Sequence, residues 1–125
     1  MTARKSTETP TGSFLPLTPT MFHILLTLAD GETHGYAIMQ EVARRSGGSV
    51  KLGPGTLYGA ISRLLEDGLI EESDERPDPK MDDTRRRYYR LTNFGGRVLA
   101  AETERLADLV RAARSTKVIR KLRPA

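Results

Sequence analysis

The chain has 125 residues, of which 38% are hydrophobic and 29% charged, a composition that allows one domain with a small core. Lys and Arg exceed Asp and Glu by 20 to 16, and the net charge of +4 is compatible with nucleic-acid binding without demonstrating it. The absence of cysteine excludes disulfides, thiolate metal sites and cysteine nucleophiles.

Further classes of protein are disfavoured by what the sequence lacks. No apolar run approaches the roughly 20 residues of a membrane span, and no apolar segment follows Arg4 and Lys5 as it does in a secretory signal. His23 and His34 lack the spacing and the neighbouring acids of a metal site, and no phosphate-binding loop or serine-nucleophile pattern occurs. We therefore expect a cytoplasmic protein that is not an enzyme and needs no metal or cofactor.

The N-terminal part of the chain predicts an arm followed by two helices. Residues 1–16 are rich in Thr, Ser, Pro and Gly and are expected to be disordered. The Thr18-Pro19 pair is typical of a helix start, and the apolar run behind it predicts a largely buried helix that ends at residues 30–31. A second helix is expected over residues 33–46, with His34 capping or orienting it.

The residues between Val50 and Ile70 predict one short helix around which the chain is organised. Pro54 suits its first turn and Gly68 suits the left-handed residue that ends it. Its apolar residues fall on a single stripe, formed by Leu57, Ile61, Leu64 and Leu65. The opposite face carries small, polar, aromatic and cationic residues, namely Gly55, Thr56, Tyr58, Gly59, Ser62 and Arg63.

These exposed groups suit a recognition helix that lies in the major groove of DNA. The two glycines permit close approach of the backbone, the first-turn amides can bind a phosphate, and Arg63 can reach a phosphate or read guanine. An alternative remains open at this stage, in which Tyr58 packs between helices and Arg63 is merely solvated.

After this helix, two short strands and a charged loop predict a β-hairpin wing. The strands are expected at residues 69–73 and 85–91, and alternation along the second sends Tyr88 and Tyr89 to opposite faces, so that one of them belongs to the core. Lys80 and Arg85 are candidate phosphate contacts. Several aspartates lie among them, so a solvated loop is the competing interpretation.

The remainder of the chain predicts one long helix from about Asn93 to Leu122, capped by Thr92. Apolar residues recur along it, and those that we expect to mediate dimerisation are Val98, Leu99, Leu106, Leu109, Val110 and Ala113. A helix of this length cannot be covered by three short helices. The stripe therefore implies a partner helix, most economically from a second copy of the chain.

Four sequence blocks together resemble the PadR family of bacterial transcriptional regulators. They are HGYAI at 34–38, LGPGTLYGAISRL at 52–64, EDGLI at 66–70 and RRYYRLTNFG at 86–95. The resemblance covers about residues 17–99. It implies a winged helix-turn-helix that dimerises through its C-terminal helices and represses transcription at palindromic operators, with Thr56, Tyr58, Arg63 and the wing around Lys80 and Arg85 contacting DNA.

The resemblance also implies that some members leave DNA when they bind a small-molecule effector. This chain is similar to the short members with a single C-terminal helix, but it has no tryptophan, which the multidrug-binding short members use to stack flat drugs. The expected organisation is a mainly α fold with a small β-hairpin: an arm at 1–16, a winged helix-turn-helix at 17–92, and a dimerisation helix and tail at 93–125. A winged-helix module that binds protein rather than double-stranded DNA is the alternative.

Overall fold

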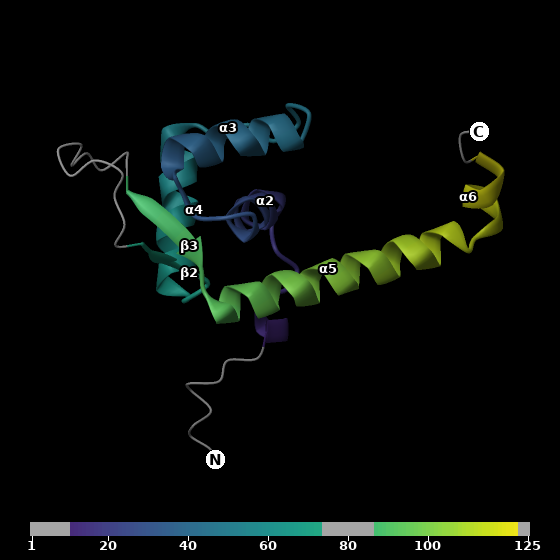
Figure 1. Ribbon diagram of the computed structural model, residues 1–125. Coiled ribbons are helices and arrows are strands. Elements are labelled where there is room, and N and C mark those ends of the chain that lie inside the picture. Colours follow the sequence, from purple (N-terminus) through teal and green to yellow (C-terminus); the bar gives the residue numbers. More distant parts are fainter. Residues whose placement is uncertain (1–10, 74–86, 123–125) are drawn as a thin grey trace, which may run out of the picture.

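The computed structural model describes residues 11–73 and 87–122, which form a helical globular part from which one long helix projects (Figure 1). The bounds of the elements follow the chain. They are the 3-10 helix η1 (Thr11–Phe14), α2 (Pro19–Ala29), β1 (Thr33–His34), α3 (Gly35–Arg45), α4 (Pro54–Glu66), β2 (Ile70–Glu72), β3 (Tyr88–Leu91), α5 (Asn93–Arg114) and α6 (Lys117–Leu122). Residues 1–10 of the arm expected to be disordered at 1–16 lie outside the described residues. For residues 11–16 that expectation is wrong, because Phe14 of η1 and the following Leu15 pack against the core and the Phe14 ring meets Phe94 edge-on at 5.6 Å.

Three helices begin at the polar caps that the sequence predicts. The Thr18 side chain accepts a hydrogen bond from the Met21 amide at 3.1 Å, and His34 Nδ1 accepts one from the Ala37 amide at 3.2 Å. Thr92 Oγ1 likewise accepts one from the Gly95 amide at 2.9 Å. Each bond satisfies one amide that has no partner inside its own helix, which stabilises the helix start by about 1 kcal/mol.

One core joins the globular part to the first turns of α5. Its buried apolar residues are Ile24, Leu25, Leu28, Ile38, Val42, Leu57, Ile61, Leu64, Leu69, Ile70, Tyr89, Val98 and Leu99. The apolar stripe predicted for α4 is confirmed at three positions and is wrong at Leu65, which is 36% exposed. Leu65 directly follows the buried Leu64, and one step along a helix turns a side chain by about 100°, so that it leaves the face that α4 buries.

The sheet has three antiparallel strands in the order β1-β3-β2. The second helix begins at Gly35 with His34 as its cap, so the start expected at Thr33 is wrong, and Thr33 and His34 also pair with Tyr89 and Tyr88 as β1, which the sequence did not predict. This pairing joins residues more than fifty positions apart, so the residues around Thr33 and His34 give no indication of it in the sequence. The two tyrosines do face opposite sides, since Tyr89 is 4% exposed in the core and Tyr88 is half-buried beside the His34 ring.

The single long C-terminal helix predicted from the sequence is wrong, because it is broken between α5 and α6. The Ser115 hydroxyl donates to the Ala112 carbonyl at 2.7 Å, and the Thr116 hydroxyl donates to the Ala113 carbonyl at 2.8 Å. Thr116 Oγ1 also accepts from the Ile119 amide, as a cap of the new helix does. Two adjacent hydroxyl residues thus compete with the backbone for its hydrogen bonds and redirect the chain.

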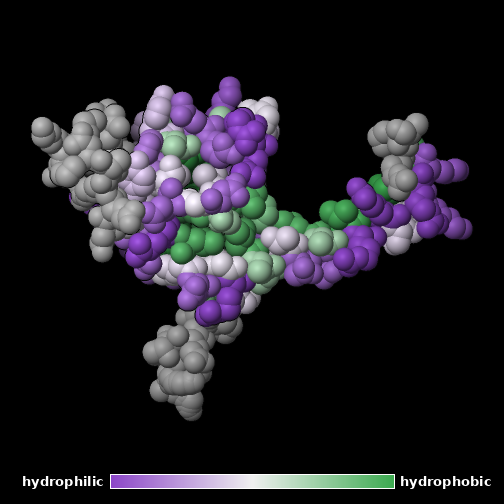
Figure 2. Space-filling model, in the orientation of Figure 1, coloured by the Kyte–Doolittle hydropathy of each residue, from purple (hydrophilic) through white to green (hydrophobic). Residues whose placement is uncertain are grey.

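The second half of α5 extends away from the globular part (Figure 1). Val98 and Leu99 were expected to mediate dimerisation but are buried within their own chain, which corrects that assignment. Leu106 is half-buried, whereas Leu109 is 54% and Val110 50% exposed. Figure 2 shows apolar surface passing from the globular part onto this projecting helix. Among residues 11–73 and 87–122, no helix combines the length and apolarity that crossing a lipid bilayer requires.

Candidate nucleic-acid interface

The start of α4 presents backbone amides that its own chain leaves without a side-chain cap. Gly53 precedes the helix with an extended backbone and makes no capping hydrogen bond, and Pro54 occupies the first turn. The first amides of any helix have no carbonyl partner within it. They carry the positive end of the helix dipole, so this end of α4 is suited to an anion such as a phosphate.

The outer face of α4 is exposed as the sequence predicts. Leu57, Ile61 and Leu64 are buried against the core. The exposed face comprises Gly55, Thr56, Gly59, Ser62 and Arg63, which we call the α4 outer face. At both glycines, no heavy atom lies within 4 Å of the place that a Cβ would occupy. Packing within the chain therefore does not require glycine at either position.

Tyr58 differs from the other predicted contacts because it fills a space between α4 and α3. It is half-buried and packs against the core. A Cβ at Gly35, the first residue of α3, would collide with the Tyr58 hydroxyl oxygen and lie 2.9 Å from its ring carbon Cζ. The reading in which Tyr58 packs between helices is thus supported by its surroundings, and Gly35 is the residue that makes room for it.

Arg63 is held only loosely within its chain. Its side chain is 65% exposed, and its Nε lies 3.5 Å from Asp67 Oδ2 one helical turn away. Exposed pairs of this kind contribute at most about 0.5 kcal/mol. The guanidinium can therefore leave Asp67 for a phosphate or a guanine at little cost.

The predicted wing contacts cannot be placed, because Lys80 and Arg85 lie outside the described residues. Two arginines that follow, Arg87 just before β3 and Arg90 on it, are engaged with acids of the neighbouring strand β2. Arg87 NH1 lies 2.9 Å from Glu72 Oε2, and Arg90 Nε lies 2.8 Å from Glu71 Oε2. These pairs offset much of the positive charge that the sequence places at the base of the wing.

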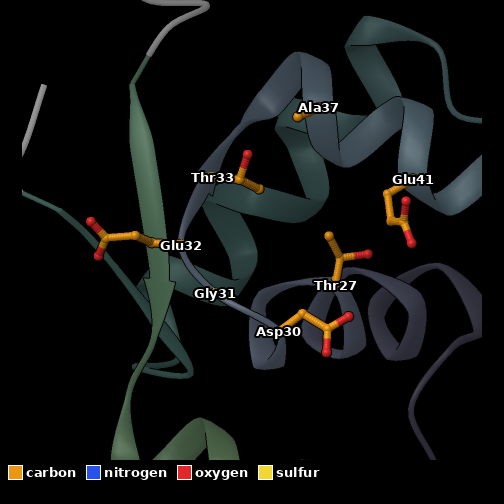
Figure 3. Close-up of a pocket in the computed structure, with 7 residues that line it drawn as sticks. All are labelled: Thr27, Asp30, Gly31, Glu32, Thr33, Ala37 and Glu41. Carbon is orange, nitrogen blue, oxygen red and sulfur yellow. The ribbon is translucent and has the colours of Figure 1, made fainter. Parts of the chain in front are cut away.

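A pocket at the end of α2 is acidic and does not suit DNA. It is lined by Thr27, Asp30, Gly31, Glu32, Thr33, Ala37 and Glu41 (Figure 3). Arg45 NH2 joins two of these carboxylates, at 2.8 Å from Asp30 and 3.1 Å from Glu41. A hydrogen bond from Arg44, opposed in part by desolvation, lowers the pKa of Glu41, so this carboxylate stays charged at neutral pH. The lining itself contributes carboxylates and no basic side chain, so the pocket suits a phosphate less well than the α4 outer face does.

Sequence reasoning missed two features, one on α3 and one on α5. Tyr36, the second residue of α3, is 56% exposed, and it directly follows the glycine that contacts Tyr58. The sequence could have drawn attention to Tyr36, because an aromatic residue on an otherwise polar helix face is unusual. The second feature is Glu102, which is 1% exposed and accepts hydrogen bonds from the Leu17 amide and from Arg105. A charged residue on a polar helix face gave no sign of that burial.

No set of three or more histidine, cysteine or acidic side chains could hold a metal ion in the part of the chain that the structure describes. What the described residues do present is a helix-turn-helix pair, α3 and α4, followed by two strands of a small sheet and a long helix. An exposed polar face on the second helix of such a pair is the arrangement of a winged helix-turn-helix DNA-binding protein.

Comparison with known proteins identifies the family. The model of the transcriptional regulator PadR-like family matches residues 24–101, and the chain belongs to this family. It is 38% identical over 89 residues to the transcriptional regulator Rv3488 of Mycobacterium tuberculosis, covering 71% of this chain and 77% of that protein. The same identity over 86 residues links it to a 37.1 kDa protein in transposon TN4556 of Streptomyces fradiae, of whose length the match spans only 22%.

Solved structures agree with this assignment. The crystal structure of a PadR family transcription regulator from Clostridium difficile superposes with a TM-score of 0.63 at 26% identity, covering 76% of this chain and 94% of that one. Bacillus subtilis PadR in complex with operator DNA shares the fold with a TM-score of 0.57 at 22% identity, covering 69% and 47%. The chain is therefore a DNA-binding transcriptional regulator and not an enzyme, which confirms both expectations drawn from the sequence.

Proposed function

We propose that the protein is a homodimeric repressor that binds a palindromic operator in double-stranded DNA through the α4 outer face. Each copy places α4 in a major groove with the helix start directed toward the DNA. Thr56 and Ser62 donate to phosphates or base edges, and Arg63 donates to a phosphate or to guanine. Tyr58 shapes this surface through its contact with Gly35. Lys80 and Arg85 contribute further phosphate contacts from the wing. Acting on DNA places the protein in the bacterial cytoplasm.

The observation that carries this proposal is the pair of glycines on the α4 outer face. Glycine within an exposed helix costs about 1 kcal/mol relative to alanine. The open space around Gly55 and Gly59 means that no contact among residues 11–73 and 87–122 accounts for that cost. A surface that approaches the helix backbone closely does account for it, and the wall of a DNA groove is such a surface.

The exposed part of α5 supports the dimer. Leu109 and Val110 belong to the second half of α5, which projects from the globular part (Figure 1), and they are 54% and 50% exposed. Leu106 and Ala113 continue the same face, one turn before and after these residues. Paired helices from two copies bury such a stripe and set two α4 helices at a fixed separation.

Binding to the DNA upstream of the protein's own gene tests the proposal. Fluorescence anisotropy with that DNA and with a scrambled duplex of the same composition separates specific from general attraction. We expect operator affinity to exceed the affinity for scrambled DNA by at least about a thousandfold. Equal affinities would refute a sequence-specific regulator and would favour a winged-helix module that binds protein.

The proposal includes release of DNA by a small-molecule effector held where α5 of two copies meets the helices of the globular part. This feature rests on the resemblance to a family in which some members leave DNA when they bind a small molecule. A thermal-shift screen with phenolic and drug-like compounds tests it. A stabilising compound that also lowers operator affinity supports release, and a broad panel without such a compound contradicts it.

A further inference from the structure

The residues just beyond the end of α4 contact the start of α5, although 24 positions separate Gly68 from Thr92 in the chain. Thr92 makes hydrogen bonds to both sides of this junction. Its hydroxyl lies 2.7 Å from the Gly68 carbonyl oxygen and 3.1 Å from that of Leu69, to which its amide also donates at 3.1 Å. The same hydroxyl oxygen accepts from the Gly95 amide in the first turn of α5. One residue therefore caps α5 and holds the chain that closes α4.

Gly95 lets the first turn of α5 approach the chain just beyond the end of α4 more closely than a residue with a side chain could. A Cβ at this position would collide with the Leu69 carbonyl oxygen and lie 2.8 Å from the carbonyl carbon. These are backbone atoms of a residue that is 1% exposed, so they cannot swing aside as a flexible side chain does. The next residue provides a contrast, because the nearest heavy atom to a Cβ at Gly96 is Leu91 Cδ2 at 3.8 Å, an ordinary contact.

We propose that Thr92 and Gly95 are positioning residues that fix the angle between α4 and α5, and thereby the half-site spacing that a dimer accepts. This inference rests on the proposed dimeric repressor. Directional hydrogen bonds and a backbone contact define an angle, whereas the apolar packing of Val98 and Leu99 against the core is non-directional.

The length of α5 amplifies small errors at this junction. Its 22 residues span about 33 Å at 1.5 Å per residue. A tilt of about 5° at the junction moves the far end by about 3 Å, close to the axial rise of one base pair, about 3.4 Å. If dimer contacts form along the exposed far half of α5, such a tilt changes the separation of the two α4 helices by a comparable distance.

The test compares operator spacings. Operators are prepared with one or two base pairs inserted or removed between the half-sites, together with a single half-site duplex, and affinities are measured by anisotropy. Each added base pair rotates one half-site by about 35° relative to the other, so a rigid dimer tolerates few changes. Wild type should prefer one spacing, with a loss of about tenfold or more at the others.

Two variants perturb the junction and two serve as matched controls. Thr92→Val removes the hydroxyl at nearly constant shape, with Thr92→Ser as its control, and Gly95→Ala introduces the clash, with Gly96→Ala as its control. We expect the controls to keep the wild-type profile. The two junction variants should shift the preferred spacing by about one base pair or reduce the discrimination below about threefold, with half-site affinity held within about twofold.

The outcomes separate the inference from the proposed function. Folded Thr92→Val protein with an unchanged spacing profile would overturn the inference while leaving the proposed repressor intact. If Gly95→Ala does not fold, the result for Thr92→Val is sufficient to test the inference. A wild type that binds a palindrome no better than a half-site would refute the dimeric repressor, and the positioning role would fall with it. Thermal unfolding of every variant separates a change in spacing from a loss of structure.

Discussion

Gly59 and Gly95 are both helical glycines, but a side chain would meet very different surroundings at the two positions. At Gly95 an added Cβ meets the backbone of Leu69, so the fold itself requires glycine. At Gly59 it meets open space on the α4 outer face. The first glycine serves the contact between two elements of the chain. Gly59 lowers helix stability but serves no packing contact among the described residues. We therefore propose that it allows the close approach of DNA.

Gly59→Ala should therefore change stability and DNA affinity in opposite directions. We expect the free energy of unfolding to rise by about 0.5–1 kcal/mol, because alanine loses less backbone entropy in a helix. Operator affinity should fall by about tenfold, since a methyl group forced into a close interface costs on the order of 1–3 kcal/mol. Urea denaturation and anisotropy measure the two effects. Unchanged operator affinity in the variant would remove Gly59 from the interface.

Arg63→Ala should weaken operator binding and leave the fold intact. Loss of an arginine contact to a base or phosphate costs about 1–3 kcal/mol of binding free energy. The pair with Asp67 is exposed, so stability should change by less than about 0.5 kcal/mol. Arg111→Ala is a suitable control, because Arg111 forms a similar exposed pair with Asp108 on α5. Equal losses of affinity in the two variants would indicate a general charge effect.

Glu102 is the residue whose environment sequence reasoning could not anticipate. The hydrogen bond from Arg105 and the Leu17 amide outweigh burial and lower the pKa of its carboxyl from the usual 4.5. A carboxyl with a lowered folded pKa stabilises the protein above its unfolded pKa, and the contribution disappears as pH falls through the folded value. It thereby ties the segment ahead of α2 to α5 in its charged form.

Glu102→Gln tests this contribution through its pH dependence. At neutral pH we expect the variant to be less stable by about 1–3 kcal/mol, the cost of leaving buried hydrogen-bonding groups imperfectly paired. The difference from wild type should shrink as pH falls below about 4.5, because wild-type Glu102 then loses its charge too. Urea denaturation of both proteins across this range measures it. A difference that does not depend on pH would show that shape rather than charge matters.

Among the elements, α5 combines two functions along its length. Its first turns complete the core through Val98 and Leu99, and its second half leaves the globular part with Leu109 and Val110 exposed. The sequence displays a single apolar stripe and cannot show where the core ends, because that depends on how far α2 and η1 reach along α5. Caps were easier to predict, since Thr18, His34 and Thr92 act on amides only three residues away.

Leu109→Ser should convert the proposed dimer to monomer at micromolar concentration. Helix pairing along the exposed half of α5 depends on apolar burial, and a buried leucine contributes about 1.5–3 kcal/mol per copy. Light scattering after gel filtration gives the mass directly. Glu104→Ser, on an exposed polar position of the same helix, should leave the mass unchanged. A monomeric wild type, or a Leu109→Ser variant that remains dimeric, would place the interface elsewhere.

At the scale of the whole molecule, charge is distributed more sharply than the net value of +4 suggests. Acidic side chains gather at the pocket beside α2, and Arg87 and Arg90 are paired with β2 acids. The α4 outer face, by contrast, offers Arg63 and the open helix start. We therefore expect DNA to approach the side of the α4 outer face rather than the pocket side.

Operator binding should weaken steeply with salt despite the modest net charge. Each phosphate neutralised by the protein contributes about −0.9 to the slope of log affinity against log salt concentration. A dimer with two α4 helices and their neighbouring contacts should give a slope of about −4 or steeper. Anisotropy titrations between about 50 and 200 mM salt measure this slope. A slope near zero would contradict binding through the phosphate backbone.

The sequence by itself determined the features that depend on neighbours a few residues apart. These are the helix starts at Thr18, His34 and Thr92, the exposed face of α4, the opposed tyrosines of β3, and the sequence blocks that identify the family. Such features follow from helix and strand periodicity and from capping chemistry, which act locally.

Only the tertiary structure decided the features that join distant parts of the chain. It paired Thr33 and His34 with β3, buried Glu102 beneath the segment ahead of α2, placed Val98 and Leu99 in the core, and locked the end of α4 to the start of α5 through Thr92 and Gly95. Each of these contacts joins residues that lie far apart in the sequence. These contacts form only once the core has brought the distant residues together. The residues next to each of them in the sequence therefore do not reveal the contact.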